Sequence, residues 1–491
     1  MTITRSMQMR QRTLVLGLVV ITALLPAAAQ QPDRSRPPEP LPPPALKLPS
    51  IQRFHLSNGV SVMLLEKHQV PLVQVTLLVR GGSVNDPAGK EGLAAMTGQM
   101  MTEGAGTRDA LALADAIDFL GASISASGGL HTFDVSMFSP LSKLDSALAL
   151  MADVALRPAF PGAELERKRT QWLTTLLQWR DEPHVLASLA FNSTLYGSHP
   201  YGRPGIGTEA SIRSLTVNDL RQFHAATFTA NNASLIVVGD VDKRVIVRKL
   251  EQAFGRWRKG KELAPSLPAM RQVEATGVTL VDKPGAAQSV IRIGRIGVQR
   301  ITDDYWALVV MNTILGGSFT SRLNQNLRET HGYTYGANSS FQFRLLPGPF
   351  VIGTSVQTAI TDSALVEIMN ELRRIREEVS DEELTRAKNY VALGFPSDFQ
   401  TVSQIAGRLE EISVYGLNPE YFNTYTANVL AVTKDDVLRV ARRYLDPDRV
   451  AIVLVGDRSA IEEKVSALSL GTLTTKTIDD VVGPAPVITK E

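Results

Sequence analysis

The chain has 491 residues, of which 44% are hydrophobic, so it is too long for one ordinary domain and has enough apolar side chains for two or more cores. Its formal net charge is +2, and its charged residues, 20% of the total, are spread without basic runs. This distribution gives no electrostatic basis for binding nucleic acid or an anionic membrane surface, so we expect neither partner. The absence of cysteine excludes disulfides.

The N-terminus has the pattern of a secretory signal. Three arginines precede an apolar run over 14–25, and a small-residue stretch ends at Ala29. We therefore predict a signal peptide at 1–29 and an exported protein, in the periplasm or an equivalent compartment. An uncleaved membrane anchor is the alternative, but about a dozen apolar residues fall short of the ~20 that a span needs. After cleavage we expect no membrane span.

A Pro-rich spacer at 30–50 separates this signal from the folded part. The following residues alternate between β-rich runs and helical periodicity, with Gly and Pro at the turns. In chain order we expect strands within 53–82, helices at 91–103 and 109–120, a strand pair over 121–138, helices at 141–155 and 161–180, a helix at 216–227 and a strand at 233–240.

The window GLAAMTGQMMTEGAGTR, at 92–108, has the frame of an inverted zinc-peptidase motif. That motif places two imidazoles at i and i+4 on one helical face to bind Zn²⁺, with a Glu beside them as general base. Here the histidine positions hold Ala95 and Gln99, and the Glu position holds Gly98. The alternative is an ordinary buried helix.

The third ligand of such a motif is a Glu on a downstream helix, six residues after an arginine. The matching helix is at 164–177, and the position six residues after Arg169 is Thr175. The seven histidines of the chain include no pair four residues apart. All ligand and base positions are therefore neutral, and we predict no metal and no other cofactor in this chain.

The sequence also contains an internal duplication. The 32 residues from Ser211 align without gaps to those from Asn428, with a Thr that begins a helix, an Asp three residues later, and a closing strand that ends in Gly-Asp. Two homologous α+β halves follow from this repeat, each a mainly antiparallel sheet covered by helices, joined to form a clamshell. The predicted halves and flanking segments are 51–257, a linker at 258–274, 275–470 and a tail at 471–491.

The second half contains a candidate chemical constellation. An apolar helix ends at Gly316, Gly317 and Ser318, and the next helix carries Arg328 in its last turn. Tyr335 follows seven residues later, after a chain reversal. A guanidinium and a phenol brought together there are suitable donors for a developing oxyanion. The alternative is a helix-end arginine that offsets the helix dipole and a half-buried strand tyrosine.

Over nearly all of 51–460 the chain resembles the pitrilysin, insulin-degrading-enzyme and mitochondrial-processing-peptidase superfamily of inverted-motif zinc endopeptidases. The resemblance rests on LSNGVSVML, the degenerate window, GSHPYGRPGIGT, both VGD strands and GGSFTSRLNQNLRETHGYTYG. In that family the second half supplies an Arg and a Tyr, seven residues apart, that hold the scissile carbonyl. Arg328 and Tyr335 match this pair, and Gly316–Ser318 match a glycine-rich loop that contacts substrate.

The resemblance implies an exported, metal-free subunit that forms a heterodimer with a zinc-bearing homologous peptidase. Zinc is expected in the partner chain, and a peptide is the expected substrate. A scaffold or peptide-binding protein without a role in chemistry is the alternative. An independent enzyme with an unorthodox metal site is a third reading, which the neutral residues Ala95, Gly98 and Thr175 disfavour because they cannot ligate a metal or deprotonate water.

Overall fold

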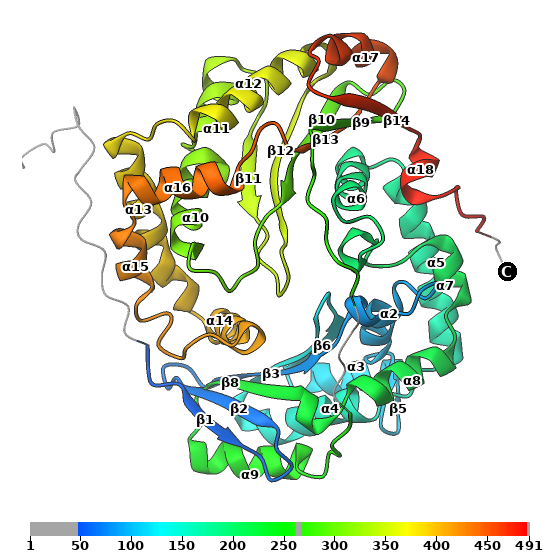
Figure 1. The fold of residues 1–491 in the computed structure, drawn as a ribbon. Helices are drawn as coiled ribbons and strands as arrows, with labels where there is room; N and C mark the ends of the chain where they lie inside the picture. The colour runs from blue at the N-terminus through cyan, green and yellow to red at the C-terminus, as the bar shows by residue number, and fades with distance from the viewer. Residues whose placement is uncertain (1–47, 262–266, 489–491) are drawn as a thin grey trace, which may run out of the picture. The chain divides into compact units, whose positions relative to one another are not determined.

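The computed structural model describes residues 48–261 and 267–488 (Figure 1). The predicted signal peptide at 1–29 lies outside the described residues, as do most of the predicted spacer and a short part of the predicted linker. Among the described residues, none of the helices combines the length and the apolar character that crossing a bilayer requires.

The first half is built on a six-stranded sheet with the order β1-β2-β8-β3-β7-β6. All neighbouring strands pair antiparallel except β2 and β8, which pair parallel. The strands are β1 (Gln52–His55), β2 (Ser61–Glu66), β3 (Leu72–Arg80), β6 (Ser123–Gly128), β7 (Thr132–Pro140) and β8 (Ala233–Gly239).

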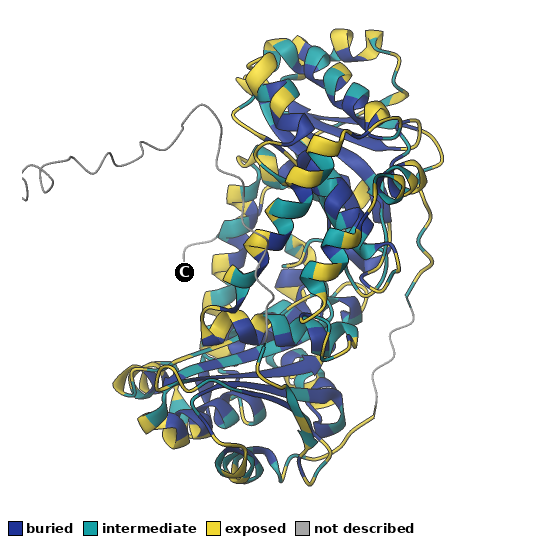
Figure 2. Cartoon of the chain, turned by 90° about the vertical axis from the view of Figure 1, so that its left-hand side faces the viewer, coloured by how far each residue is buried: buried dark blue, intermediate teal, exposed yellow. Residues whose placement is uncertain are grey.

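Helices of the same half cover one face of this sheet and close the first hydrophobic core. Figure 2 shows the buried residues concentrated in the strands and on the inner sides of the helices. All five helices expected in this half are present, with ends within about three residues of the expected ones. They are α2 (Leu93–Met100), α3 (Ala110–Phe119), α4 (Leu144–Leu156), α5 (Gly162–Trp179) and α8 (Val217–Thr227). Helix α9 (Lys243–Phe254), which also contributes to this core, was not expected.

The second half is built on a sheet of order β11-β12-β10-β13-β9-β14, in which the first five strands repeat the order of the first sheet from its other edge. The sixth strand differs, because β1 precedes β2 in the chain and pairs with it antiparallel, whereas β14 follows β13 and pairs with β9 parallel. Strand β9 pairs parallel with β13 and with β14, and the other neighbouring strands pair antiparallel. The strands are β9 (Gly277–Asp282), β10 (Gln288–Ile296), β11 (Ala337–Phe341), β12 (Pro349–Gln357), β13 (Ala451–Gly456) and β14 (Thr472–Lys476). The second sheet therefore extends past residue 470, into the segment predicted as a tail.

Helices again cover one face and form a second core. They are α10 (Tyr305–Asn312), α12 (Thr361–Arg374), α13 (Asp381–Gly394), α15 (Tyr425–Ala431), α16 (Lys434–Tyr444) and α17 (Arg458–Ala467). The α+β fold class is thus confirmed as two mixed sheets, each covered by helices.

The duplicated capping motif forms as predicted in both halves. The Thr216 hydroxyl accepts a hydrogen bond from the Asp219 backbone at the start of α8, and Thr433 and Asp436 do the same at the start of α16. Each helix is followed by a central strand of its sheet, β8 between β2 and β3 or β13 between β9 and β10. The internal repeat in the sequence therefore corresponds to the same helix and strand in each half.

The second face of each sheet is covered by a helix from the other half, which sequence analysis did not predict. Helix α6 (Pro183–Tyr196) packs on β10 and β13, whereas α14 (Val402–Tyr415) packs on β3 and β8 (Figure 1). Both faces of both sheets are therefore buried, which explains the continuous apolar runs of β8 and β13.

Two carboxyl groups meet where α14 contacts the first sheet. Burial raises the pKa of Asp134 on β7 to about 6. Burial and repulsion from Asp134 together raise the pKa of Glu410 on α14 to about 7. Because the folded chain holds protons that the unfolded chain releases above about pH 4, the free energy of unfolding falls as the pH rises from about 4 to about 7.

Glu410→Gln should therefore stabilise the protein at pH 8 by about 1–2 kcal/mol, a value discounted because solvent partly reaches the group. At pH 4.5 the two proteins should be nearly equal, since Glu410 is then protonated in the folded state. Urea unfolding at both pH values measures the difference. The matched control is Glu382→Gln on α13, whose carboxylate is exposed. A gain that is equal at both pH values would contradict this assignment.

Candidate functional site

The four neutral positions of the degenerate motif lie on α2 and α5, which contact each other. The Gln99 side-chain oxygen accepts a hydrogen bond of 3.1 Å from the Trp172 indole of α5. Ala95 is half-buried against the first core. Thr175, three residues after Trp172, donates to the Gln171 carbonyl at 3.0 Å. The frame expected of a metal site is thus present, but its side chains serve packing and local hydrogen bonds.

At Gly98, the position of the general base, there is no room for a side chain. A Cβ at this position would lie 2.2 Å from the backbone nitrogen of Gly128 and 2.5 Å from the carbonyl carbon of Ser127, both on β6. Real Cβ atoms essentially never approach backbone so closely, so α2 lies directly against β6 at this point. No general base can stand at position 98 unless the backbone moves.

Among the described residues, one other group of side chains is close enough to share a metal ion: Glu66, His68 and Asp242. It lies at the end of β2 and the start of α9, outside the α2–α5 contact. The His68 ring bonds Asp240 at 2.7 Å, and this hydrogen bond raises the pKa of His68. The His68 ring also lies 3.5 Å from Glu66, and the three side chains of the group are half-buried or exposed, so we interpret the group as a surface ion-pair cluster.

The glycine-rich segment of the second half follows α10 as a π-helix, η5 (Thr313–Gly317). The Ser318 hydroxyl donates to the Thr313 carbonyl at 3.2 Å and closes this turn. The Asn324 amide then donates to the carbonyls of Ser318 and Ala337, at 3.2 and 2.9 Å. The loop is therefore fixed to the start of β11. π-helical segments of this kind are frequent at functional sites.

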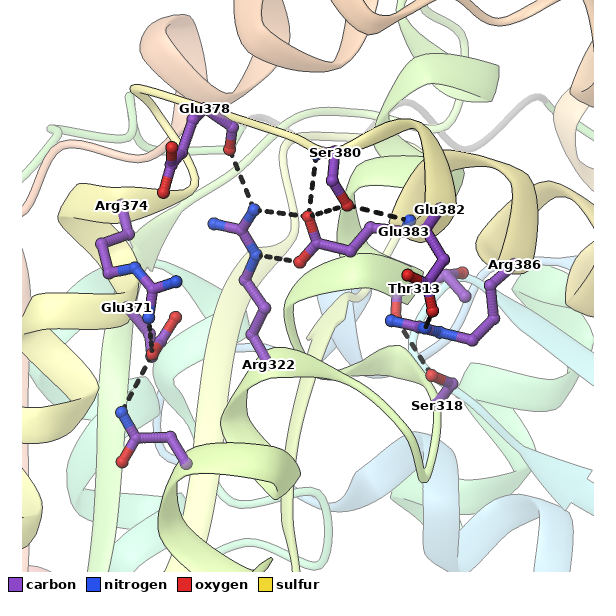
Figure 3. Close-up of polar contacts among 11 residues, drawn as sticks. Thr313, Ser318, Arg322, Glu371, Arg374, Glu378, Ser380, Glu382, Glu383 and Arg386 are labelled. Atoms are coloured by element: carbon purple, nitrogen blue, oxygen red, sulfur yellow. Dashed lines mark hydrogen bonds and ion pairs between the residues drawn. The ribbon is translucent and has the colours of Figure 1, made fainter. Parts of the chain in front are cut away.

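A buried ion pair holds the far side of this segment (Figure 3). Arg322, which begins α11 (Arg322–Asn324), is 8% exposed and donates to both carboxylate oxygens of Glu383, at 2.7 and 2.9 Å. Burial raises the pKa of Glu383, but hydrogen bonds from Arg322 and Ser380 outweigh it and lower this pKa to about 2. The pair therefore stays charged in neutral solution and anchors α11 to the start of α13.

Tyr335 and the glycine-rich segment line one cavity of about 610 Å³. Tyr335 is 93% exposed and lies in the loop before β11. The alternative of a half-buried strand tyrosine therefore does not hold. Its phenol is presented to the cavity rather than packed in the core. Gly316, Gly317 and Ser318 line the same space.

Arg328 lies beside this cavity, in the last turn of the π-helix η6 (Gln325–Thr330), as the sequence predicted. Its guanidinium carbon is 4.2 Å from the ring centroid of Phe319, which lines the cavity, and one nitrogen is 2.8 Å from Glu329. Tyr335 and the glycine-rich segment thus line one cavity, whereas Arg328 is not among its lining residues and adjoins it through Phe319. All of them belong to the second half.

Sequence reasoning missed three residues that line the cavity: Arg292 on β10, His184 on α6 and Tyr390 on α13. Arg292 had a detectable signal, because it interrupts the apolar run of a central strand. His184 and Tyr390 had none, since both reach the cavity through contacts between segments distant in the chain.

The close approach of α2 to β6 predicts opposite effects of two helical Gly→Ala substitutions. Alanine in a helix normally stabilises by about 0.5–1 kcal/mol relative to glycine. Gly407→Ala on α14 should show this gain, because a Cβ there meets open space. Gly98→Ala should instead lower the free energy of unfolding by about 2 kcal/mol, because the methyl group overlaps the β6 backbone. Thermal or urea unfolding measures both, and a stabilising Gly98→Ala would contradict the close contact.

Two family models match the chain in sequence. Insulinase (peptidase family M16) matches residues 61–209, which include α2 and the first part of the first sheet. Peptidase M16 inactive domain matches residues 214–391, which include Gly316–Ser318, Arg328 and Tyr335. Both halves therefore match one family.

The curated relatives carry similar names. An uncharacterized zinc protease of Mycobacterium leprae is 28% identical over 71% of this chain and 78% of its own length. One of Rickettsia bellii is 26% identical over 81% of this chain and 96% of its own length.

Solved structures agree at the level of the fold. A crystal structure named as a peptidase M16 inactive domain from Pseudomonas fluorescens has a TM-score of 0.78 and 27% identity, over 83% of this chain and 98% of that one. A protease from Helicobacter pylori has a TM-score of 0.77 over 83% of this chain and all of that one (100%), and its 22% identity supports the fold alone. With both halves matched by the same family, the chain belongs to the insulinase (M16) peptidase family.

Proposed function

We propose that the chain is an exported, metal-free subunit of a heteromeric zinc endopeptidase. A zinc-bearing homologous partner supplies the metal and the general base. This chain supplies Arg328 and Tyr335, which contact the scissile carbonyl, and the glycine-rich loop Gly316–Ser318, which contacts the peptide.

One observation carries the proposal: the second half has side chains that can contact a substrate, whereas the first half has neither metal ligands nor a general base at the motif positions. Tyr335 lines a cavity beside the glycine-rich loop, whereas the motif positions on α2 and α5 hold only neutral residues, and position 98 has no room for a side chain. Core packing does not explain the position of the Tyr335 side chain, because this side chain buries almost no area. It is instead suited to a ligand that occupies the cavity.

The proposed chemistry uses donors only. A peptide carbonyl gains negative charge as a partner's metal-bound water attacks it, and the Tyr335 hydroxyl donates a hydrogen bond to that oxygen. Arg328 adds a fixed positive charge nearby, with its orientation set by the Phe319 ring and Glu329. Neither residue has to exchange a proton.

Edge strands support a peptide as the ligand. Strand β6 ends the first sheet and β11 ends the second, next to Tyr335. An edge strand offers backbone N–H and C=O groups to which an extended peptide can add as a further strand. Peptide binding by this route needs no particular side-chain sequence.

A scaffold or peptide-binding role is the second candidate. Arg328 already has two partners within this chain, Phe319 and Glu329. A helix-end arginine that is held in this way fits a structural role as well as a catalytic one. The reconstituted complex distinguishes the two roles.

In a complex with a zinc-bearing homologue, Tyr335→Phe should lower kcat by a factor on the order of 10²–10³, because it removes one donor to the developing charge. Arg328→Ala should also weaken substrate binding, since it deletes a fixed cation. A peptidase assay on the co-purified complex measures both effects. Assembly should be unchanged, because the Tyr335 ring is exposed.

The matched control is Tyr333→Phe, two residues away, whose ring stacks on His331. It should leave turnover within a few-fold of wild type. The chain alone should cleave no peptide and hold no stoichiometric zinc by elemental analysis. Unchanged turnover of an intact Tyr335→Phe complex would leave only the scaffold or peptide-binding role.

Export is a separate prediction, drawn from the N-terminal sequence. The mature protein should begin near Gln30, because the small-residue site precedes it. N-terminal sequencing of protein from the periplasmic fraction measures this directly. Recovery of Met1 from a membrane fraction would favour the uncleaved anchor.

A further inference from the structure

Arg292 is a charged residue in the middle of β10, between Ile291 and Ile293. Those two isoleucines belong to the second core, so Arg292 points to the opposite face of the sheet, where α6 packs. It lines the cavity that contains Tyr335 and also a second, smaller cavity of about 170 Å³. The guanidinium therefore connects the two spaces.

The position of the guanidinium depends on a glycine in the neighbouring strand. Arg292 pairs with Gly353 of β12, which in turn pairs with Asn338 of β11, the edge strand. A Cβ at Gly353 would lie 1.9 Å from the Arg292 Nη1 atom and 3.0 Å from the Asn338 side-chain oxygen. Arg292 thus lies over β12 and reaches toward the sheet edge.

Arg292 has no acidic partner among the described residues, whereas two more deeply buried arginines of the same half each have one. Arg300 and Arg322 bond Glu411 and Glu383 at 2.7 Å. For Arg292 burial alone lowers the pKa, with no opposing carboxylate. A partly buried cation without an anion is costly, so its retention points to a ligand that supplies the negative charge.

The surroundings of Arg292 are polar and contain no acid. Neither cavity is lined by Asp or Glu. Within the described residues, the Asn192 and Asn338 side chains in the smaller cavity make no hydrogen bond to protein, so their amides can donate to a ligand. About 170 Å³ corresponds to several water molecules at ~30 Å³ each, which is room for one side-chain-sized group.

We propose that Arg292 is a carboxylate-binding site that selects acidic peptides: it binds an Asp or Glu side chain, or the C-terminal carboxylate, of a peptide that also occupies the Tyr335 cavity. The inference rests on the proposed function in one respect, that the ligand is a peptide. The planar guanidinium pairs with both oxygens of the carboxylate, and Asn192 and Asn338 supply further donors.

The test measures peptide binding to the purified chain alone, by calorimetry. The probes are three Ala/Ser-rich peptides of about twelve residues with acetylated N-termini. The first has one central Glu and an amidated C-terminus, the second has Gln in place of Glu, and the third is the Gln peptide with a free C-terminal carboxylate. The Glu peptide should bind about tenfold or more tightly than the Gln peptide, because charge-assisted hydrogen bonds to Arg292 are available only to the acid.

Arg292→Gln should reduce this preference to within about twofold, and Arg292→Lys should keep part of it, since a lysine retains the charge but not the fork of donors. The matched control is Arg295→Gln on the same strand, because Arg295 points to the other face and lies near Asp446. It should leave the preference intact. Circular dichroism and thermal unfolding check the fold of each variant.

The Gln peptide with a free C-terminus could bind more tightly than its amide while the Glu and Gln amides bind equally. That result would assign the site to the C-terminal carboxylate and would support the same chemistry. Equal affinities of the wild-type chain for all three peptides overturn the proposal without any variant. So does an undiminished preference in folded Arg292→Gln, or the absence of binding up to about 1 mM. Because no zinc partner is present, failure of the composite peptidase leaves these affinities unaffected.

Discussion

The reciprocal packing of α6 and α14 is the constraint on which the rest of the structure depends. Each sheet buries one face under its own helices and the other under a helix of the opposite half. Strands with apolar residues on both faces, such as β8 and β13, are stable only under this double cover. The exchange also places His184, Ser188 and Asn192 of α6 opposite Arg292 of β10, so that residues of the first half line the cavities of the second.

The same fold separates packing from chemistry. At α2 the backbone of one element lies against the backbone of another, and the only side chain with hydrogen-bonding capacity on the ligand face, Gln99, is held by Trp172. At the glycine-rich loop the Asn324 amide fixes the Ser318 carbonyl and Arg322 anchors the following turn to α13, while Gly316, Gly317 and Ser318 line the cavity. Rigid support behind an open surface is what a preorganised binding site requires.

Local patterns in the sequence were sufficient for much of this description. The capping boxes at Thr216 and Thr433, the helices of the first half and the helical position of Arg328 depend on neighbouring residues, and they formed as predicted. The covering helices α6 and α14, the stack of Arg328 on Phe319 and the exposure of Tyr335 depend on segments distant in the chain, and periodicity carries no information about them. Arg292 was predictable only in part. Its charge within an apolar strand was visible in the sequence, but the absence of an acidic residue around it depends on distant segments and was not visible.

Charge balance links the two sites. A single-chain zinc peptidase sets a divalent cation and its carboxylates against the donors that bind the carbonyl. In this chain the carboxylates of the motif are absent, whereas the cations Arg328 and Arg292 remain near one open region. Arg328 is partly neutralised by Glu329, but Arg292 is not neutralised by any described residue. In the function proposed above, this positive charge would bind the negative charge of a peptide, first as a carboxylate on binding and then as an oxyanion during attack. The second half thus keeps cations that can bind negative charge, whereas the first half lacks the metal ligands and the general base. This division is consistent with the proposed subunit, which acts only when a partner supplies the metal.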